Sequence, residues 1–138
     1  RGTATDLNAP LGALNRIFRR RAIVFLLTDF LANDYERALG ITAARHDLVP
    51  IHTVDDRERV LPDAGWVAFV DSETGEHFEI NTSDPAARAI FEREAMAQLL
   101  RVKERCRRAR ADVIQIDAEA PFEKALHRFF ELRRLHRR

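Results

Sequence analysis

The sequence predicts an α/β fold in which a parallel sheet is flanked by helices and carries a β-hairpin insertion. Amphipathic helical stripes alternate with short apolar runs, two further β runs surround a glycine, and acidic residues follow the apolar runs. Such alternation is typical of a parallel sheet built through right-handed crossovers. At 138 residues with 46% hydrophobic residues, the chain is expected to form one domain, residues 1–138.

The N-terminal part is predicted to alternate helix, strand, helix and strand. Apolar residues spaced four, three and four apart indicate a first helix: Leu7, Leu11, Leu14 and Phe18. This helix is expected to be capped by Thr5 or Asp6 and to end near Arg20. The continuous apolar run 22–27 (AIVFLL) predicts a central strand covered on both faces. Asn33 or Asp34 is expected to cap a second helix reaching about Arg45. Residues 48–54 are predicted to form a second strand. Pro50 has no backbone N–H group, so it is expected at a position of this strand where no hydrogen-bond donor is needed.

The remaining sequence predicts a hairpin, a long helix, a third strand and a last helix. Residues 66–71 and 77–81 surround the turn residues 73–75, which is a hairpin signal. Asp84 and Pro85 predict the start of a helix whose apolar face comprises Phe91, Ala95, Leu99, Val102, Cys106 and Ala109. Residues 112–116 form the next apolar run. A final helix from Pro121 is expected to bury Phe122, Leu126, Phe129 and Leu132.

Acidic residues follow each predicted parallel strand: Asp29, then Asp55 and Asp56, then Asp117. Parallel sheets bind ligands beyond the carboxyl ends of their strands, and carboxylates suit magnesium. One alternative is therefore a magnesium-dependent nuclease or phosphoryl-transfer enzyme that uses these four acids. The competing interpretation is local: Asp29 caps the next helix, Asp55 and Asp56 belong to a solvated loop, and Asp117 lies at the start of a helix.

Charge is unevenly distributed along the chain. The net charge is +4 over residues 1–28, −9 over residues 29–100 and +6 over residues 101–138. Solvated helix faces explain such a pattern, and a basic surface for an acidic partner is the functional alternative. Nonspecific nucleic-acid binding would use the basic residues Arg101, Arg105, Arg108, Arg133, Arg134, Arg137 and Arg138, but no aromatic platform or base-reading motif accompanies them.

Other residue types restrict the class of protein further. No apolar run approaches the length of a membrane span, so no membrane insertion by this segment is expected. The single cysteine, Cys106, excludes an internal disulfide framework and fits a cytoplasmic protein, and its place on an apolar helix face favours a buried structural thiol. The histidines show no metal-ligand spacing and are expected to be surface or strand residues: His46, His52, His77, His127 and His136.

Several separated motifs occur in the order found in one bacterial family. They are RRRAIVFLLTDFL at 19–31, ARHDLV at 44–49, LPDAG at 61–65, DSETGE at 71–76 and LHRFFELRR at 126–134. From about Thr5 to the C-terminus the chain resembles the bacterial domain of unknown function 58 family. That family is similar to von Willebrand factor A domains, which have a Rossmann-type fold. The resemblance implies that this chain is the C-terminal portion of such a domain.

The resemblance also implies a metal site and partners. The metal-ion-dependent adhesion site of von Willebrand factor A domains combines a D-x-S-x-S loop, a Thr and a later Asp; by position, Thr5 and Asp29 match the last two. No D-x-S-x-S occurs in these 138 residues, so a magnesium site is expected to be incomplete. The family resembles partners of MoxR-type AAA+ ATPases in protein maturation or assembly. We therefore expect a binding or scaffolding module rather than an enzyme, which also forms homo-oligomers through an exposed sheet edge.

Overall fold

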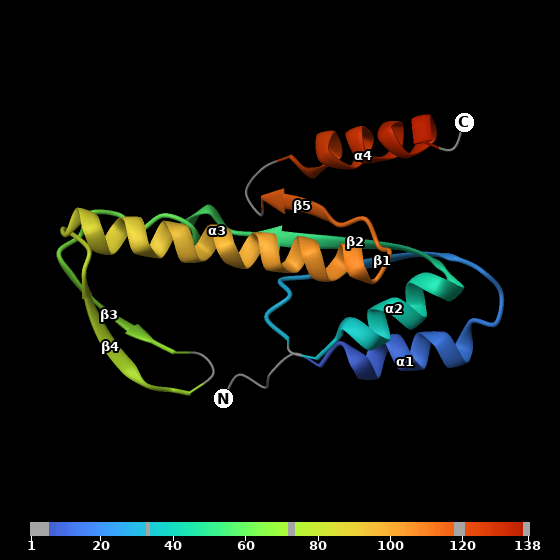
Figure 1. Ribbon diagram of the computed structural model, residues 1–138, viewed down its shortest axis with the longest axis horizontal. Helices are drawn as coiled ribbons and strands as arrows, with labels where there is room; N and C mark the ends of the chain where they lie inside the picture. Colours follow the sequence, from blue (N-terminus) through green and yellow to red (C-terminus); the bar gives the residue numbers. More distant parts are fainter. Residues whose placement is uncertain (1–5, 33, 72–73, 118–120, 137–138) are drawn as a thin grey trace.

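The structure, a computed structural model, describes residues 6–32, 34–71, 74–117 and 121–136. Its helices are α1 (Asn8–Ile17), α2 (Glu36–Arg45), α3 (Pro85–Arg108) and α4 (Phe122–His136), with a short 3₁₀ helix, η1 (Asp56–Glu58). Its strands are β1 (Ile23–Thr28), β2 (Asp47–Val54), β3 (Trp66–Val70), β4 (His77–Asn81) and β5 (Ile114–Asp117). The predicted order of elements is confirmed, including the hairpin (Figure 1).

The main sheet is parallel and has the strand order β1-β2-β5. Ile23 is level with Asp47, and Thr28 is level with His52. On the other side of β2, Ile51 is level with Ile114 and Val54 with Asp117. β2 is the middle strand of the described sheet, and β1, the run predicted to be a central strand, pairs with β2 alone among the described strands. Pro50 lies in β2, opposite Leu26 and one residue before the β5 pairing begins.

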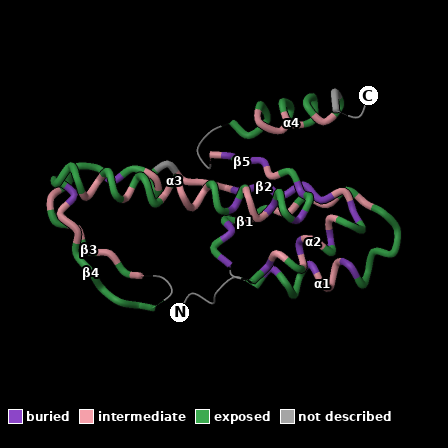
Figure 2. The backbone as a smooth tube through the Cα atoms, in the orientation of Figure 1, coloured by how far each residue is buried: buried purple, intermediate pink, exposed green. Residues whose placement is uncertain are grey.

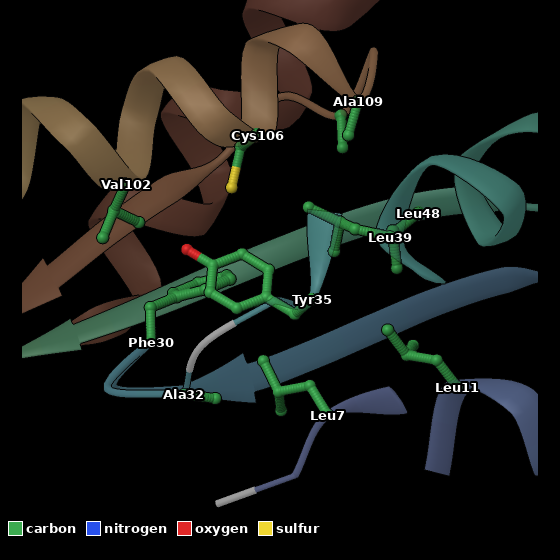
Figure 3. Close-up of a cluster of buried hydrophobic side chains, with 11 residues drawn as sticks. Leu7, Leu11, Phe30, Ala32, Tyr35, Leu39, Leu48, Val102, Cys106 and Ala109 are labelled. Atoms are coloured by element: carbon green, nitrogen blue, oxygen red, sulfur yellow. The ribbon is translucent and has the colours of Figure 1, made fainter. Parts of the chain in front are cut away.

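Helices cover the two faces of the sheet unequally. On one face, side chains from α1, α2, α3 and the loop after β1 surround the buried ring of Tyr35, and this cluster includes Leu11, Leu39, Val102 and Cys106 (Figure 3). On the opposite face, α4 is the one described helix that packs against the sheet, through Ala125, Leu126 and Phe129. Residues of β2 alternate between the two cores because successive side chains of a strand point to opposite faces. The sheet therefore has one thickly covered face and one thinly covered face.

Helix boundaries differ modestly from the prediction. The first helix ends at Ile17 rather than Arg20, and the Asp6 carboxylate accepts a hydrogen bond from the Asn8 amide at 2.9 Å, as a residue near a helix start does. The start of α2 is Glu36; Asn33 lies outside the described residues, and Asp34 has a positive φ of 56°. In α4, Phe122 and Leu132 remain about half exposed, so only part of its predicted apolar face is buried.

The hairpin β3–β4 forms a separate two-stranded antiparallel sheet at the far end of α3 from the main sheet (Figure 1). Its base is bound by Thr82, which is fully buried. The Thr82 hydroxyl donates to the Gly65 carbonyl at 2.8 Å and accepts from the Ala64 amide at 2.9 Å. The Arg88 guanidinium donates to the Thr82 carbonyl, and the predicted cap Asp84 accepts from the Ala86 amide at 2.9 Å. These hydrogen bonds attach the hairpin to the first turn of α3.

Candidate docking surface

The acids predicted at the carboxyl edge of the sheet are engaged locally. Asp29 is exposed, and its carboxylate accepts a hydrogen bond from the Leu31 amide at 3.1 Å. Asp55 accepts from the Arg57 amide at 2.8 Å and pairs with the Arg57 guanidinium at 3.2 Å. These hydrogen bonds, the amide first, lower the pKa of Asp55 below its usual value. Asp56 belongs to η1, and Asp117 ends β5.

The structure describes only one of the two predicted metal ligands. Thr5 lies outside the described residues, and Asp29 uses a carboxylate oxygen in its own turn. Among the residues that the structure describes, no group of three or more His, Cys, Asp or Glu side chains converges as a metal site would require. The described residues therefore do not fit a complete magnesium site.

The feature that stands out at the carboxyl half of the sheet is the outer face of β1. Val24 and Leu26 pack against the core formed with α1, α2 and α3. The alternate residues Ile23, Phe25 and Leu27 are 62%, 50% and 65% exposed. A run as apolar as this is ordinarily covered on both faces in a parallel sheet. One face and one edge of β1 are thus apolar and open among the described residues.

A hollow lies beside this open face, between the sheet and α4. Its volume is about 450 Å³, in the range of protein binding sites. The lining side chains come from all three strands and from the first half of α4: Phe25, Leu27, Ile51, Thr53, Ile116, Asp117, Phe122 and Leu126. Phe25, one of these lining residues, also meets the ring of Phe130 edge-on, with ring centroids 6.1 Å apart. The hollow is therefore suited to an apolar side chain rather than to a charged ligand.

The sequence did not identify this hollow. Its apolar residues were expected to belong to the core. Ile23, Phe25 and Leu27 alternate with Val24 and Leu26, but the same apolar run occurs in a strand that is buried on both faces, so the sequence does not show which face is exposed. Exposure depends on which elements lie next to β1, and that is a tertiary property. Figure 2 shows how burial varies along the chain, with exposed and half-buried residues mixed along α4 and along the hairpin.

The hairpin presents a second exposed surface. Trp66 is 71% exposed, whereas Phe69 is half-buried and stacks on Phe78 with ring centroids 5.7 Å apart. Trp66 is therefore exposed, whereas Phe69 belongs to an aromatic stack within the hairpin. A Trp held on a fixed support is a common anchor in protein interfaces.

Three of the seven basic residues proposed for phosphate contacts, Arg105, Arg108 and Arg133, form ion pairs within the chain. Arg105 pairs with Glu36 at 3.1 Å, and Arg133 pairs with Asp47. Arg107 and Arg108 both hydrogen-bond Glu104, and these bonds lower the pKa of Glu104 to about 2. Arg137 and Arg138 lie outside the described residues. Internal pairing of the described arginines favours the interpretation of these charges as helix surface.

The conspicuous titratable side chains of the core also have structural roles. Cys106 is fully buried, and burial raises its pKa to about 12, which confirms the predicted structural thiol. His52 is buried against the ring of Phe30, and burial lowers its pKa. The ring of His46 accepts a hydrogen bond from the Ala22 amide at 3.3 Å and is also buried. The expectation of surface or strand histidines holds for His52, whereas His46 is a buried residue between the end of α2 and the start of β2.

No helix within the described residues is long and apolar enough to cross a membrane. No solved structure matches the chain. The chain is 34% identical over 134 residues to the uncharacterized protein MAV169 of Mycobacterium avium, a match that covers 96% of this chain and 79% of that protein. At the same identity it matches the uncharacterized proteins Mb1516 of Mycobacterium bovis and Rv1480 of Mycobacterium tuberculosis.

The chain spans 42% of the length of these last two relatives. Residues 1–101 match the family described as protein of unknown function DUF58, which is the family that the sequence motifs indicated. That match covers well over half of the chain, and the relatives extend it to nearly the whole. The chain therefore belongs to the DUF58 family.

Proposed function

We propose that this chain is a protein-binding module that receives a partner at β1 and at the hollow beside α4, the site defined by Phe25, Leu27, Thr53 and Leu126. The observation that supports it is the exposure of three large apolar residues on a strand that is otherwise part of the core. At roughly 25 cal/mol per Å² of apolar surface removed from water, covering them would contribute several kcal/mol to binding.

The partner class follows from the family resemblance. A MoxR-type AAA+ ATPase is the proposed partner, with the module acting in the maturation or assembly of other proteins in the cytoplasm. The relation to von Willebrand factor A domains is part of the same proposal. It is consistent with a parallel sheet flanked by helices, and the docking site proposed above lies at the carboxyl half of that sheet. The module is proposed to bind rather than to catalyse.

Filling the hollow tests this role. Thr53 is half-buried and points into the hollow from the central strand, so Thr53→Phe occupies the space without touching the backbone edge of β1. Binding of a purified MoxR-type ATPase to the immobilised chain should weaken at least tenfold. The matched control is Ile90→Phe, which adds a ring on the exposed side of α3 and should leave binding unchanged.

Circular dichroism verifies that both variants are folded. Equal affinity of Thr53→Phe, Ile90→Phe and the unmodified chain would show that the hollow is not the docking site. Absence of binding by the unmodified chain would refute the ATPase as the partner.

A further inference from the structure

We propose that one face of the hairpin β3–β4, the Trp66 face, binds a basic amphipathic helix of a partner protein. The hairpin lies at the far end of α3 from the main sheet, so this face is separate from the hollow beside α4 and extends binding beyond the docking site proposed above (Figure 1). Alternate residues of the two strands form the Trp66 face: Trp66, Ala68 and Val70 from β3, and His77, Glu79 and Asn81 from β4.

The strand register places an apolar strip beside a polar strip on the Trp66 face. The three side chains that β3 contributes are apolar, whereas the three from β4 are polar. Trp66 is 71% exposed and Val70 is 57% exposed. Glu79 is also exposed and lies directly opposite Ala68, so it is diagonal to both Trp66 and Val70, at roughly 7–8 Å. A carboxylate therefore stands beside the middle of the apolar strip.

The segment that forms the hairpin, residues 61–84, is strongly acidic. It contains no Lys or Arg, and its six acids are Asp63, Asp71, Glu73, Glu76, Glu79 and Asp84. Asp63 pairs with Arg88 at 3.8 Å and Asp84 caps α3, so these two acids belong to the base of the hairpin. Glu76 and Glu79 are exposed. The potential around the Trp66 face is therefore negative, which attracts a basic partner and repels an acidic one.

Apolar side chains and negative charge together specify the chemistry of the partner. A helix whose apolar stripe is flanked by Lys or Arg would lay the stripe along the β3 strip and place a cation beside Glu79. A second cation over the Trp66 ring would add a cation–π interaction. Nucleic acid does not fit this face, because the acids that attract a basic helix repel phosphates.

Contacts within the hairpin segment hold the Trp66 face in place. The Thr82 hydroxyl bonds Ala64 at 2.9 Å and Gly65 at 2.8 Å, next to Trp66 in the chain. On the other face of the hairpin, the rings of Phe69 and Phe78 stack. The shape of the Trp66 face is thus determined by the hairpin itself and does not depend on the edge of the main sheet. A preformed surface loses little conformational entropy when a partner binds.

Fluorescence tests the location of binding, because Trp66 is the single tryptophan of the chain. The probe is a synthetic helical peptide of leucine and lysine, LKKLLKLLKKLLKL, and its acidic counterpart LEELLELLEELLEL is the control. The basic peptide should shift Trp66 emission to shorter wavelength and protect the indole from acrylamide quenching, whereas the acidic peptide should do neither. Unchanged emission at saturating basic peptide would overturn the proposal.

Variants test the two properties of the Trp66 face separately, by fluorescence anisotropy of the labelled basic peptide. Trp66→Ala should weaken binding at least ~tenfold, and Glu79→Lys about fivefold. The matched controls are Met96→Ala, which removes an exposed apolar side chain from α3, and Glu131→Lys, which makes the same charge change on α4. Both controls should bind like the unmodified chain. Should Trp66→Ala disturb the hairpin, Glu79→Lys still decides, since its side chain is exposed; equal affinity of Glu79→Lys and Glu131→Lys would refute the role of the hairpin charge.

Two other occupants of the Trp66 face give distinct results. The chain spans 42% of its longer relatives, and a version extended upstream to their length should bind the basic peptide with unchanged affinity. Loss of binding on extension would show that upstream sequence covers the face, and would overturn the proposal. So would a dimer of the isolated chain that Trp66→Ala dissociates in sedimentation velocity, since the occupant would then be a second copy. Thr53→Phe separates this proposal from the preceding one, because it should weaken ATPase binding and leave peptide binding unchanged.

Discussion

Asp29 was predicted as a metal ligand and is found in a local turn, where its carboxylate accepts the Leu31 amide. Acids at strand ends serve both roles, because a carboxylate satisfies free amides as readily as it binds cations. Position in the sequence alone does not separate the two. The geometry of the neighbouring residues does: among the described residues, Asp29 belongs to no group of three or more His, Cys, Asp or Glu side chains that could hold a metal ion.

This arrangement predicts weak magnesium binding. A single carboxylate that already shares an oxygen with an amide leaves most of a magnesium coordination shell to water. Isothermal titration of the isolated chain should therefore give an affinity in the millimolar range or weaker, equal within error for the unmodified chain and Asp29→Asn. Micromolar binding that Asp29→Asn abolishes would contradict this prediction.

Cys106 provides a prediction about reactivity and pH. Its pKa is raised by burial to about 12, so at pH 8 the thiolate fraction is about a thousandfold lower than for a thiol with a pKa of 9. Modification by a thiol reagent should be correspondingly slow in the folded chain and rapid in guanidinium chloride. Equal rates in the two conditions would show that the thiol is accessible.

The raised pKa of Cys106 also affects the free energy of unfolding at high pH. The unfolded chain releases the Cys106 proton from about pH 9, whereas the folded chain retains it until about pH 12. The contribution of this thiol is therefore complete below pH 9 and falls as the pH rises through that interval. Urea unfolding at pH 8 and pH 10 should show the lower stability at pH 10, and replacement by Ala should reduce the difference between the two.

At the scale of elements, the hairpin depends on its attachment to α3. An isolated two-stranded hairpin is marginal in water, and Thr82 supplies the hydroxyl that bonds both Ala64 and Gly65. Thr82→Val keeps the shape and removes these bonds, which should cost about 1–3 kcal/mol locally. Amide exchange in β3 and β4 should then accelerate, while exchange in β2 and β5 stays the same.

Thr74→Val is the matched control for the hairpin. Thr74 is exposed in the hairpin turn, where its hydroxyl accepts a hydrogen bond from the Glu76 amide at 3.2 Å. Its replacement should change exchange little outside the turn. If Thr82→Val and Thr74→Val gave the same exchange pattern, Thr82 would not be the attachment of the hairpin.

At the scale of the whole molecule, the order and type of the elements were predictable from the sequence. The run AIVFLL, the helix start at Asp84 and Pro85, and the paired β runs around Gly75 each depend on local periodicity and backbone preference. That β1 pairs with β2 alone among the described strands was not predictable from its composition, because an apolar run has the same composition with one neighbouring strand or with two. The hollow beside α4 was missed for the same reason, and Thr82 carried no signal that separates it from an ordinary turn residue.

The three arginines before β1 have a consequence during synthesis of the chain. β1 contains five apolar residues, and an apolar strand whose edge is not yet paired is a template for ordered aggregation before folding is complete. Positive charges directly flanking such a segment act as gatekeepers, since stacked copies would bring them together. Arg19, Arg20 and Arg21 occupy that flank and are exposed. They would therefore help to keep nascent chains soluble until β1 acquires a neighbour.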